Sequence, residues 1–233
     1  MEGTTAVVTG ASRGLGASVA RLFASEGAHV VVCARDAAAV DGVAEGIRED
    51  GGSATALRSD VRDEFDVERL METAAREGLG KGIDVVVANA GVYHGDPGHS
   101  PLAEDAYSAF DDHVRTNGRG VFTTVREALP HLADGARILV PSGSVARDPK
   151  AGFGSYAVSK ALAEAVVGQF AVELDVPVCV VDPGQVSTDI TGNGPGRALE
   201  DVAPMFRWAA SDVSAEDLSG AIVTLKDWKG VTR

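Results

Sequence analysis

Short apolar runs alternate along this chain with longer stretches in which apolar residues recur every three or four positions. The runs predict buried β-strands and the longer stretches predict amphipathic helices. Strands are expected at Thr5–Thr9, His29–Cys33, Ala54–Arg58, Asp84–Asn89, Arg137–Val140, Val176–Asp182 and Ala221–Leu225, and the two longest helices at about Glu104–Leu132 and Ser155–Glu173. This alternation predicts an α/β fold: a doubly wound sheet of seven mostly parallel strands with helices on both faces, in a single domain over residues 1–233.

One turn between a predicted strand and a predicted helix is rich in glycine. The segment Thr9-Gly10-Ala11-Ser12-Arg13-Gly14-Leu15-Gly16 follows the first apolar run and opens an amphipathic stretch. Strand, turn and helix in this order present backbone N–H groups and a helix N-terminus to a pyrophosphate. The spacing G-x3-G-x-G differs from the general dinucleotide fingerprint G-x-G-x-x-G, so a tight turn of any α/β protein remains the alternative.

A second segment, Tyr156-Ala-Val-Ser-Lys160, places a phenol and an ammonium group one helical turn apart. Residues i and i+4 share a helix face, so the two groups can approach each other. A free tyrosine has a pKa of about 10, and a nearby cation lowers that pKa toward a value useful in acid–base catalysis. On its own, this spacing is more often found on solvated helix surfaces.

Six markers occur along the chain in one order: Thr9 to Gly16, Asp60-Val61, Asn89-Ala90-Gly91, Asn117, Tyr156 with Lys160, and Pro183 to Thr188. Together they resemble the classical short-chain dehydrogenase/reductase family, over nearly the whole chain. The resemblance implies a Rossmann-type fold and an NAD(P)-dependent oxidoreductase that interconverts a secondary alcohol and a ketone or aldehyde. A non-catalytic nucleotide-binding regulator on the same fold is the alternative.

The resemblance also implies catalytic roles. Tyr156 would donate a proton to the carbonyl oxygen, Lys160 would lower the pKa of Tyr156 and hold the nicotinamide ribose, and Asn117 would support a water that links Lys160 to solvent. The usual serine position, thirteen residues before the tyrosine, is occupied by glycine, with Ser142 and Ser144 on either side. The proline before Ser142 fits only a strand end or a bulge. A bulge shifts side-chain direction by one place, so either serine can face the site, and we favour Ser142.

The cofactor residues implied by the resemblance fall in four groups. They are Gly10, Ser12, Arg13, Gly14, Leu15 and Gly16 at the phosphates; Asp60 and Val61 at the adenine; Asn89, Ala90 and Gly91 beside the ribose; and Pro183, Gly184, Val186 and Thr188, with Tyr156 and Lys160, at the nicotinamide end. For Asp60, a helix N-cap is an alternative role. The stretch 187–200, which is rich in Gly, Thr and Asn, predicts a flexible substrate lid.

The end of the second strand favours NADP over NAD. Where NAD-preferring relatives carry an acid this chain has Ala34, and Arg35 follows it. Arg13 could join Arg35 in a bidentate grip on the extra phosphate. NAD remains an alternative cofactor, because the carboxylate of Asp36 lies about 20 residues beyond the glycines, where it could bind the ribose hydroxyl. Asp36 could instead cap the next helix.

Charge narrows the possible partners. The net charge is −13, and the 21 basic residues comprise 5 lysines and 16 arginines. An acidic, lysine-poor surface is typical of salt-adapted, halophilic proteins, although an ordinary acidic protein from a GC-rich genome gives the same composition. Either origin argues against nucleic acid or an anionic membrane as a partner.

No charged leader and no apolar run of about 18–20 residues is present, so a cytoplasmic protein is expected. We expect a small-molecule carbonyl or alcohol substrate and, from the resemblance, a homodimer or homotetramer built on the two long helices. No metal site is predicted, since His94 and His99 with Asp96 lack a third convergent ligand.

Overall fold

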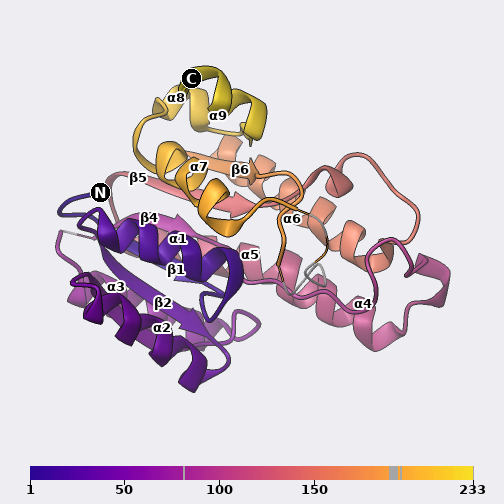
Figure 1. The fold of residues 1–233 in the computed structure, drawn as a ribbon, viewed down its shortest axis with the longest axis horizontal. Helices are drawn as coiled ribbons and strands as arrows, with labels where there is room; N and C mark the ends of the chain where they lie inside the picture. The colour runs from indigo at the N-terminus through magenta and orange to yellow at the C-terminus, as the bar shows by residue number, and fades with distance from the viewer. Residues whose placement is uncertain (81, 189–193, 195, 233) are drawn as a thin grey trace.

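The computed structural model describes residues 1–80, 82–188, 194 and 196–232. In this part of the chain seven strands form one sheet in the order β3-β2-β1-β4-β5-β6-β7, and every pairing is parallel (Figure 1). The strands are β1 (Thr5–Thr9), β2 (His29–Ala34), β3 (Ser53–Arg58), β4 (Ile83–Val87), β5 (Leu132–Pro141), β6 (Val178–Asp182) and β7 (Ile222–Thr224). The predicted doubly wound α/β sheet is confirmed.

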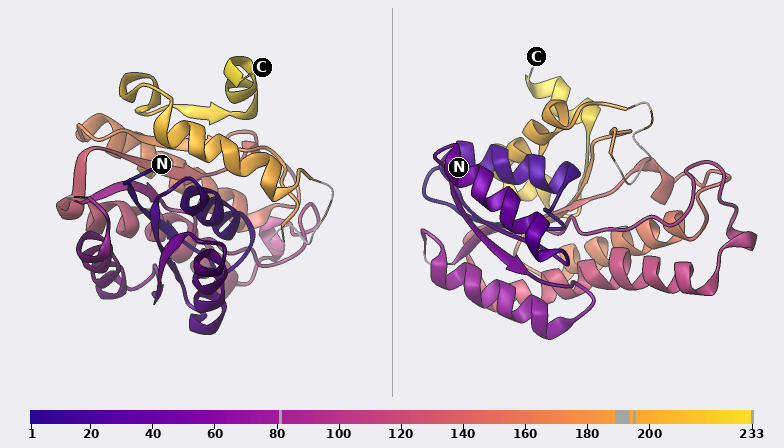
Figure 2. Two further views of the ribbon diagram at one scale, coloured as in Figure 1. Left: turned by 60° about the vertical axis from the view of Figure 1, so that its left-hand side comes forward. Right: turned by 60° about the horizontal axis from the view of Figure 1, so that its bottom comes forward.

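Helices cover both faces of the sheet (Figure 2). They are α1 (Gly14–Ser25), α2 (Ala37–Glu49), α3 (Glu64–Glu77), α4 (Tyr107–His113), α5 (Gly120–Ala128), α6 (Gly154–Glu173), α7 (Leu199–Ser211), α8 (Ala215–Leu218) and α9 (Leu225–Thr232). One apolar core packs α1, α2 and α7 on one face, and a second packs α3, α5 and α6 on the other. Strand β2 shows why: Val30 and Val32 belong to the first core and Val31 and Cys33 to the second, as the alternation of a strand buried on both faces requires.

The long helix expected at about 104–132 is present as a continuous helical stretch from Tyr107 to His131, but it contains a π turn that the sequence did not predict. Between α4 and α5 lies a π-helical turn, Val114–Arg119, and a short 3₁₀ turn follows α5 at Leu129–His131. The π turn is held by tertiary contacts: a Cβ on Gly118 would lie 2.3 Å from Leu162 Cδ2 of α6. Single π turns of this kind are frequent at functional sites, and this one contains Asn117.

The order of the strands reverses between β1 and β4, so the carboxyl ends of neighbouring strands open a crevice there. Strand β5 ends at Pro141. Proline has no backbone N–H to donate, and at the end of a strand this breaks no hydrogen bond in the middle of the sheet, as we expected from the sequence.

Cys33 on β2 and Cys179 on β6 are buried, free and separated by three strands. Among the described residues, no helix is long and apolar enough to cross a membrane.

Candidate active site

A cleft of about 780 Å³ runs along the carboxyl ends of the strands. Its described walls contain every site residue expected from the sequence except Gly16. Gly16 lies behind the wall, where a Cβ would meet Asn89 Nδ2 at 2.4 Å and the Gly10 carbonyl oxygen at 2.7 Å. It therefore allows the turn to pack closely on β4 and is not itself part of the cleft surface.

The glycine-rich turn joins β1 to α1 with its backbone open toward the cleft. Gly14 has a φ of +59°, and a Cβ built there would meet nothing within 4 Å. The backbone N–H groups in the first turn of any helix have no acceptor within the helix. At α1 the N-cap residue, Arg13, does not cap them with its side chain. These groups and the positive end of the helix dipole suit a phosphate.

Asn89 ties the ends of β1 and β4 together. Its amide nitrogen donates to the carbonyl oxygens of Thr9 at 2.9 Å and Gly10 at 3.1 Å. In return, the Thr9 hydroxyl accepts from the N–H of Ala90 at 3.0 Å. Gly10 fits this junction because a Cβ would lie 2.6 Å from Ala90 Cα. The bonds hold the floor of the crevice at the reversal of strand order.

At the far end of the cleft, Arg13, Arg35 and Asp36 lie exposed in its wall. Asp36 is the N-cap of α2, and its Oδ1 accepts from the N–H of Ala39 at 3.1 Å. The capping alternative for Asp36 is therefore confirmed. This end of the cleft therefore carries the guanidinium groups of Arg13 and Arg35 and a carboxylate, Asp36, that caps α2.

Asp60 lines the cleft as a member of an ion-pair chain that the sequence analysis missed. Its carboxylate accepts from the backbone N–H and the guanidinium of Arg62, which also bonds Asp112 at 2.7 Å. Although burial acts in the opposite direction, these bonds hold the pKa of Asp60 below its ordinary value. The N-cap of α3 is Asp63, so the capping alternative for Asp60 was wrong.

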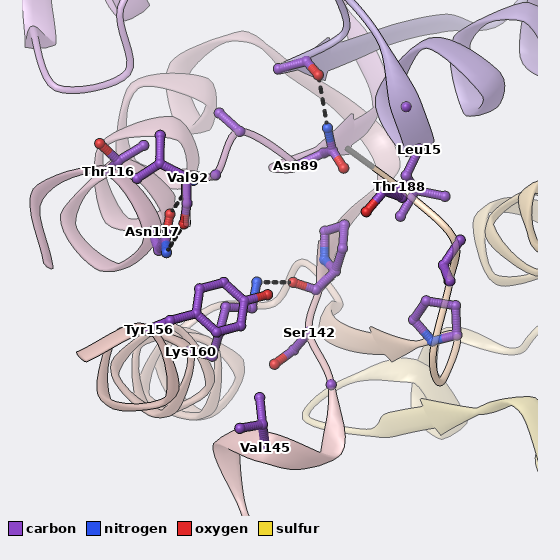
Figure 3. A pocket seen from close by; sticks show the side chains of 18 of the residues that line it. Leu15, Asn89, Val92, Thr116, Asn117, Ser142, Val145, Tyr156, Lys160 and Thr188 are labelled. Atoms are coloured by element: carbon purple, nitrogen blue, oxygen red, sulfur yellow. Dashed lines mark hydrogen bonds between the residues drawn. The ribbon is translucent and has the colours of Figure 1, made fainter. Parts of the chain in front are cut away.

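Tyr156 and Lys160 share one face of α6, half-buried at the other end of the cleft. Lys160 Nζ donates to the Pro141 carbonyl oxygen at 2.6 Å (Figure 3). Burial, reinforced by Tyr93, raises the pKa of Tyr156 to about 12. Burial lowers the pKa of Lys160 to about 8, against the opposing pull of nearby carboxylates. The expected lowering of the Tyr156 pKa was thus wrong in sign for this structure, because desolvation dominates and the ammonium binds a carbonyl.

The two serines that flank Gly143 differ sharply in environment. The Ser142 hydroxyl is buried and is one of two buried side-chain polar atoms in the described residues without a hydrogen-bond partner. Figure 3 shows Ser142 between Tyr156 and Val145. Ser144 is exposed, and its oxygen lies 3.4 Å from Lys150 Nζ. Both serines line the cleft, and only Ser142 has a buried hydroxyl without a hydrogen-bond partner.

Asn117 uses its side chain to clamp the segment after β4. Its Oδ1 accepts from the N–H of Val92 at 2.8 Å, and its Nδ2 donates to the Val92 carbonyl oxygen at 2.9 Å. The same nitrogen donates to Ser159 Oγ on α6 at 2.9 Å. Asn117 thus joins the π turn, the cleft wall and α6, while its support of a water stays a prediction.

His113 lies behind Tyr156 and was also missed by the sequence analysis. It is buried at the end of α4, with its ring centroid 6.0 Å from that of Tyr156. A signal was present, since His113 stands one helical turn before Asn117. Of the expected lid at 187–200, residues 189–193 and 195 lie outside the described part of the chain. Thr188 lines the cleft, whereas Leu199 and Glu200 belong to α7 and not to a loop.

Comparisons with known proteins agree with this geometry. The family model described as short chain dehydrogenase matches residues 4–195. An uncharacterized oxidoreductase of Methylorubrum extorquens is 33% identical over 97% of this chain and 91% of its own. Versicolorin reductase of Emericella nidulans is 34% identical over 82% of this chain and 72% of its own.

Solved structures give the same answer. A dehydrogenase/reductase of Sinorhizobium meliloti superposes with a TM-score of 0.83 and 31% identity, over 96% of this chain and 94% of that one. A short chain dehydrogenase of Burkholderia cenocepacia, in complex with NADP, gives a TM-score of 0.84 at 27% identity, over 97% of each chain. This chain therefore belongs to the short-chain dehydrogenase family of oxidoreductases.

Proposed function

We propose that this protein is an NADP-dependent oxidoreductase that interconverts a secondary alcohol and a ketone or aldehyde, with Tyr156 as the acid and base. One observation carries the proposal: Tyr156, the unpartnered hydroxyl of Ser142 and Lys160 meet at one end of a cleft. The opposite end offers an open glycine turn and two arginines. A dinucleotide spans such a cleft from its phosphates to its reactive ring.

Bound NADPH supplies the hydride, and the residues of this chain position the substrate and supply the proton. With its pKa raised to about 12, Tyr156 is protonated at neutral pH and can donate to a carbonyl oxygen. The Ser142 hydroxyl is available to donate a hydrogen bond to the same oxygen and stabilise its developing charge. Lys160, bound to the Pro141 carbonyl, fixes a positive charge beside the nicotinamide end.

The preference for NADP rests on the far end of the cleft. Arg13 and Arg35 both line it, and a planar guanidinium binds a phosphate in bidentate fashion. The carboxylate that would favour a free ribose hydroxyl, Asp36, is engaged as a helix cap. The cofactor-bound Burkholderia cenocepacia relative supports the same assignment, as does an archaeal alcohol dehydrogenase from Thermococcus sibiricus complexed with 5-hydroxy-NADP.

The proposed assembly is a homodimer or homotetramer built through α5 and α6. Phe122, Val158 and Leu162 are exposed apolar residues on these helices, and Phe122 stacks on Phe170 with ring centroids 5.9 Å apart. We place the protein in the cytoplasm, with a small-molecule substrate and with neither nucleic acid nor membrane as a partner. The net charge of −13 repels both of these polyanionic surfaces.

Tyr156→Phe tests the proposal directly. It removes the proton donor and keeps the ring, so reduction of a panel of ketones and aldehydes with NADPH should fall by about 10²–10⁴-fold. NADPH affinity, measured by fluorescence titration, should stay within about twofold, because general acid catalysis acts on the reaction and not on cofactor binding.

Two other outcomes would contradict the proposal. If Tyr156→Phe were as active as the wild type, Tyr156 would not be the proton donor. A wild type that binds NADPH but reduces no carbonyl would favour the non-catalytic regulator. Titration of NADH in parallel tests the cofactor preference, which fails if NADH binds more tightly than NADPH.

A further inference from the structure

A chain of hydrogen bonds runs through the buried ring of His113. Its Nε2 accepts the backbone N–H of His94 at 2.9 Å, and its Nδ1 lies 2.7 Å from Ser155 Oγ. The Ser155 hydroxyl in turn donates to Asp105 Oδ2 at 2.5 Å. An amide can only donate, so Nε2 carries no proton, and Nδ1 is the nitrogen that donates to Ser155. The contacts select one tautomer of the ring.

The same ring forms part of an aromatic cluster behind the proposed acid. Tyr93 stacks on His113 with ring centroids 5.9 Å apart and meets the Tyr156 ring nearly edge-on at 4.6 Å. His113 itself meets Tyr156 edge-on at 6.0 Å. Each such pair favours a defined ring orientation. Tyr93 and His113 are absent from the described walls of the cleft, so they contact Tyr156 from behind.

The chain of bonds joins the two segments that determine where the Tyr156 phenol lies. On one side is His94, which follows Tyr93 in the loop after β4. On the other is Ser155, the residue before Tyr156 in the first turn of α6, whose backbone N–H is also held by Asp105 at 2.6 Å. Asn117 also joins the loop after β4 to α6, but through Val92 and Ser159. His113 bonds the residues next to Tyr93 and Tyr156 themselves, so its loss would remove the bonds nearest the Tyr156 ring.

We propose that His113 is a positioning residue for Tyr156, holding the phenol in place through Tyr93 and through the first turn of α6. This inference rests on the proposed function, because it gives Tyr156 the role of acid. A histidine suits the position because one ring offers an acceptor to His94 and a donor to Ser155 at once. A misplacement of about 1 Å in a catalytic group can cost about 100-fold in rate.

The test compares His113→Phe with His113→Gln. Phenylalanine keeps a ring but bonds neither neighbour, so kcat for carbonyl reduction should fall at least tenfold while the Kd for NADPH stays within twofold. Glutamine can present its amide oxygen to the His94 N–H, so it should recover most of the lost kcat. His99→Gln is the matched control: His99 is exposed and lies outside the cleft, so kcat should not change.

Two results would overturn the inference while the proposed function stands. One is a His113→Phe enzyme with kcat within twofold of an active wild type. The other is a parallel fall in kcat, NADPH affinity and Tm that glutamine does not relieve, which would make the role structural only. If His113→Phe fails to fold, Tyr93→Leu replaces it, and an unchanged kcat then overturns the inference. A wild type without turnover would instead reject the proposed function, and the inference with it.

Discussion

At the scale of single residues, burial distinguishes two similar side chains in the wall of the cleft. Ser142 and Ser144 are two places apart, yet one hydroxyl is buried without a partner and the other is exposed beside Lys150. A buried hydroxyl without a partner costs free energy, which a ligand oxygen would recover. Nothing in the residue types distinguishes the two serines, so only the path of the backbone after Pro141 could do so.

Ser142→Ala should lower kcat for carbonyl reduction by about 10²–10³-fold, since it removes a donor to the oxygen on which charge develops. Ser144→Ala, the matched control, should leave kcat within about twofold, because exposed groups of this kind contribute little. Steady-state kinetics with NADPH measures both variants. The reverse ranking would show that Ser144 faces the substrate.

The pKa of Lys160, lowered by burial to about 8, predicts a pH dependence. Lys160 is a cation below that pH and loses its charge above it, so kcat/KM for reduction should fall as pH rises through about 8. Since the pKa of Tyr156 is raised to about 12, Tyr156 stays protonated near neutral pH and causes no second change in rate there. Lys160→Arg stays charged over the whole pH range of the assay, so its kcat/KM should not fall as pH rises through about 8. A wild-type profile that is flat to about pH 10 would contradict this assignment.

At the scale of elements, local pattern predicts strands well because their signal is a contiguous apolar run. Strand β1 matches its expected bounds, and β2 differs by one residue at its end. The long helix expected at about 104–132 is present, but its π turn was not predicted, because the turn depends on contacts from elsewhere: Leu162 against Gly118, and Val92 bonded to Asn117. Periodicity along one segment carries no information about such contacts.

Substitutions at two glycines can distinguish the cost of backbone strain from an effect on cofactor binding. Gly14 and Gly51 both have positive φ, and a Cβ at either would meet nothing within 4 Å. Alanine at either position should therefore cost about 1–2 kcal/mol in the free energy of unfolding. Only Gly14→Ala should also raise the Kd for NADPH, by at least about tenfold, because only Gly14 lines the cleft. Denaturant unfolding and fluorescence titration measure the two effects. Equal Kd values for both variants would show that the turn does not contact the cofactor phosphates.

At the scale of the whole molecule, the net charge of −13 predicts how stability responds to salt. If the acidic surface is a salt adaptation, raising KCl from about 0.1 M to about 2 M should raise Tm by several degrees, because it screens self-repulsion. Calorimetry at several KCl concentrations measures this. A Tm that does not change would favour the alternative, an acidic composition without salt adaptation. Sucrose at matched water activity is the control, since it lacks the screening ions.

The amino-acid sequence by itself determined the succession of strands and helices along the chain, the glycine-rich turn and the shared helix face of Tyr156 and Lys160. These features depend on residue spacing within one segment, where helix and strand periods act directly. The tertiary structure alone decided which serine is buried, the sign of the Tyr156 pKa shift and the place of His113. These depend on desolvation and on contacts between distant segments, such as His113 with Ser155, 42 residues apart. Burial and long-range contact arise only when the chain has folded, and here they decide the chemistry of the site.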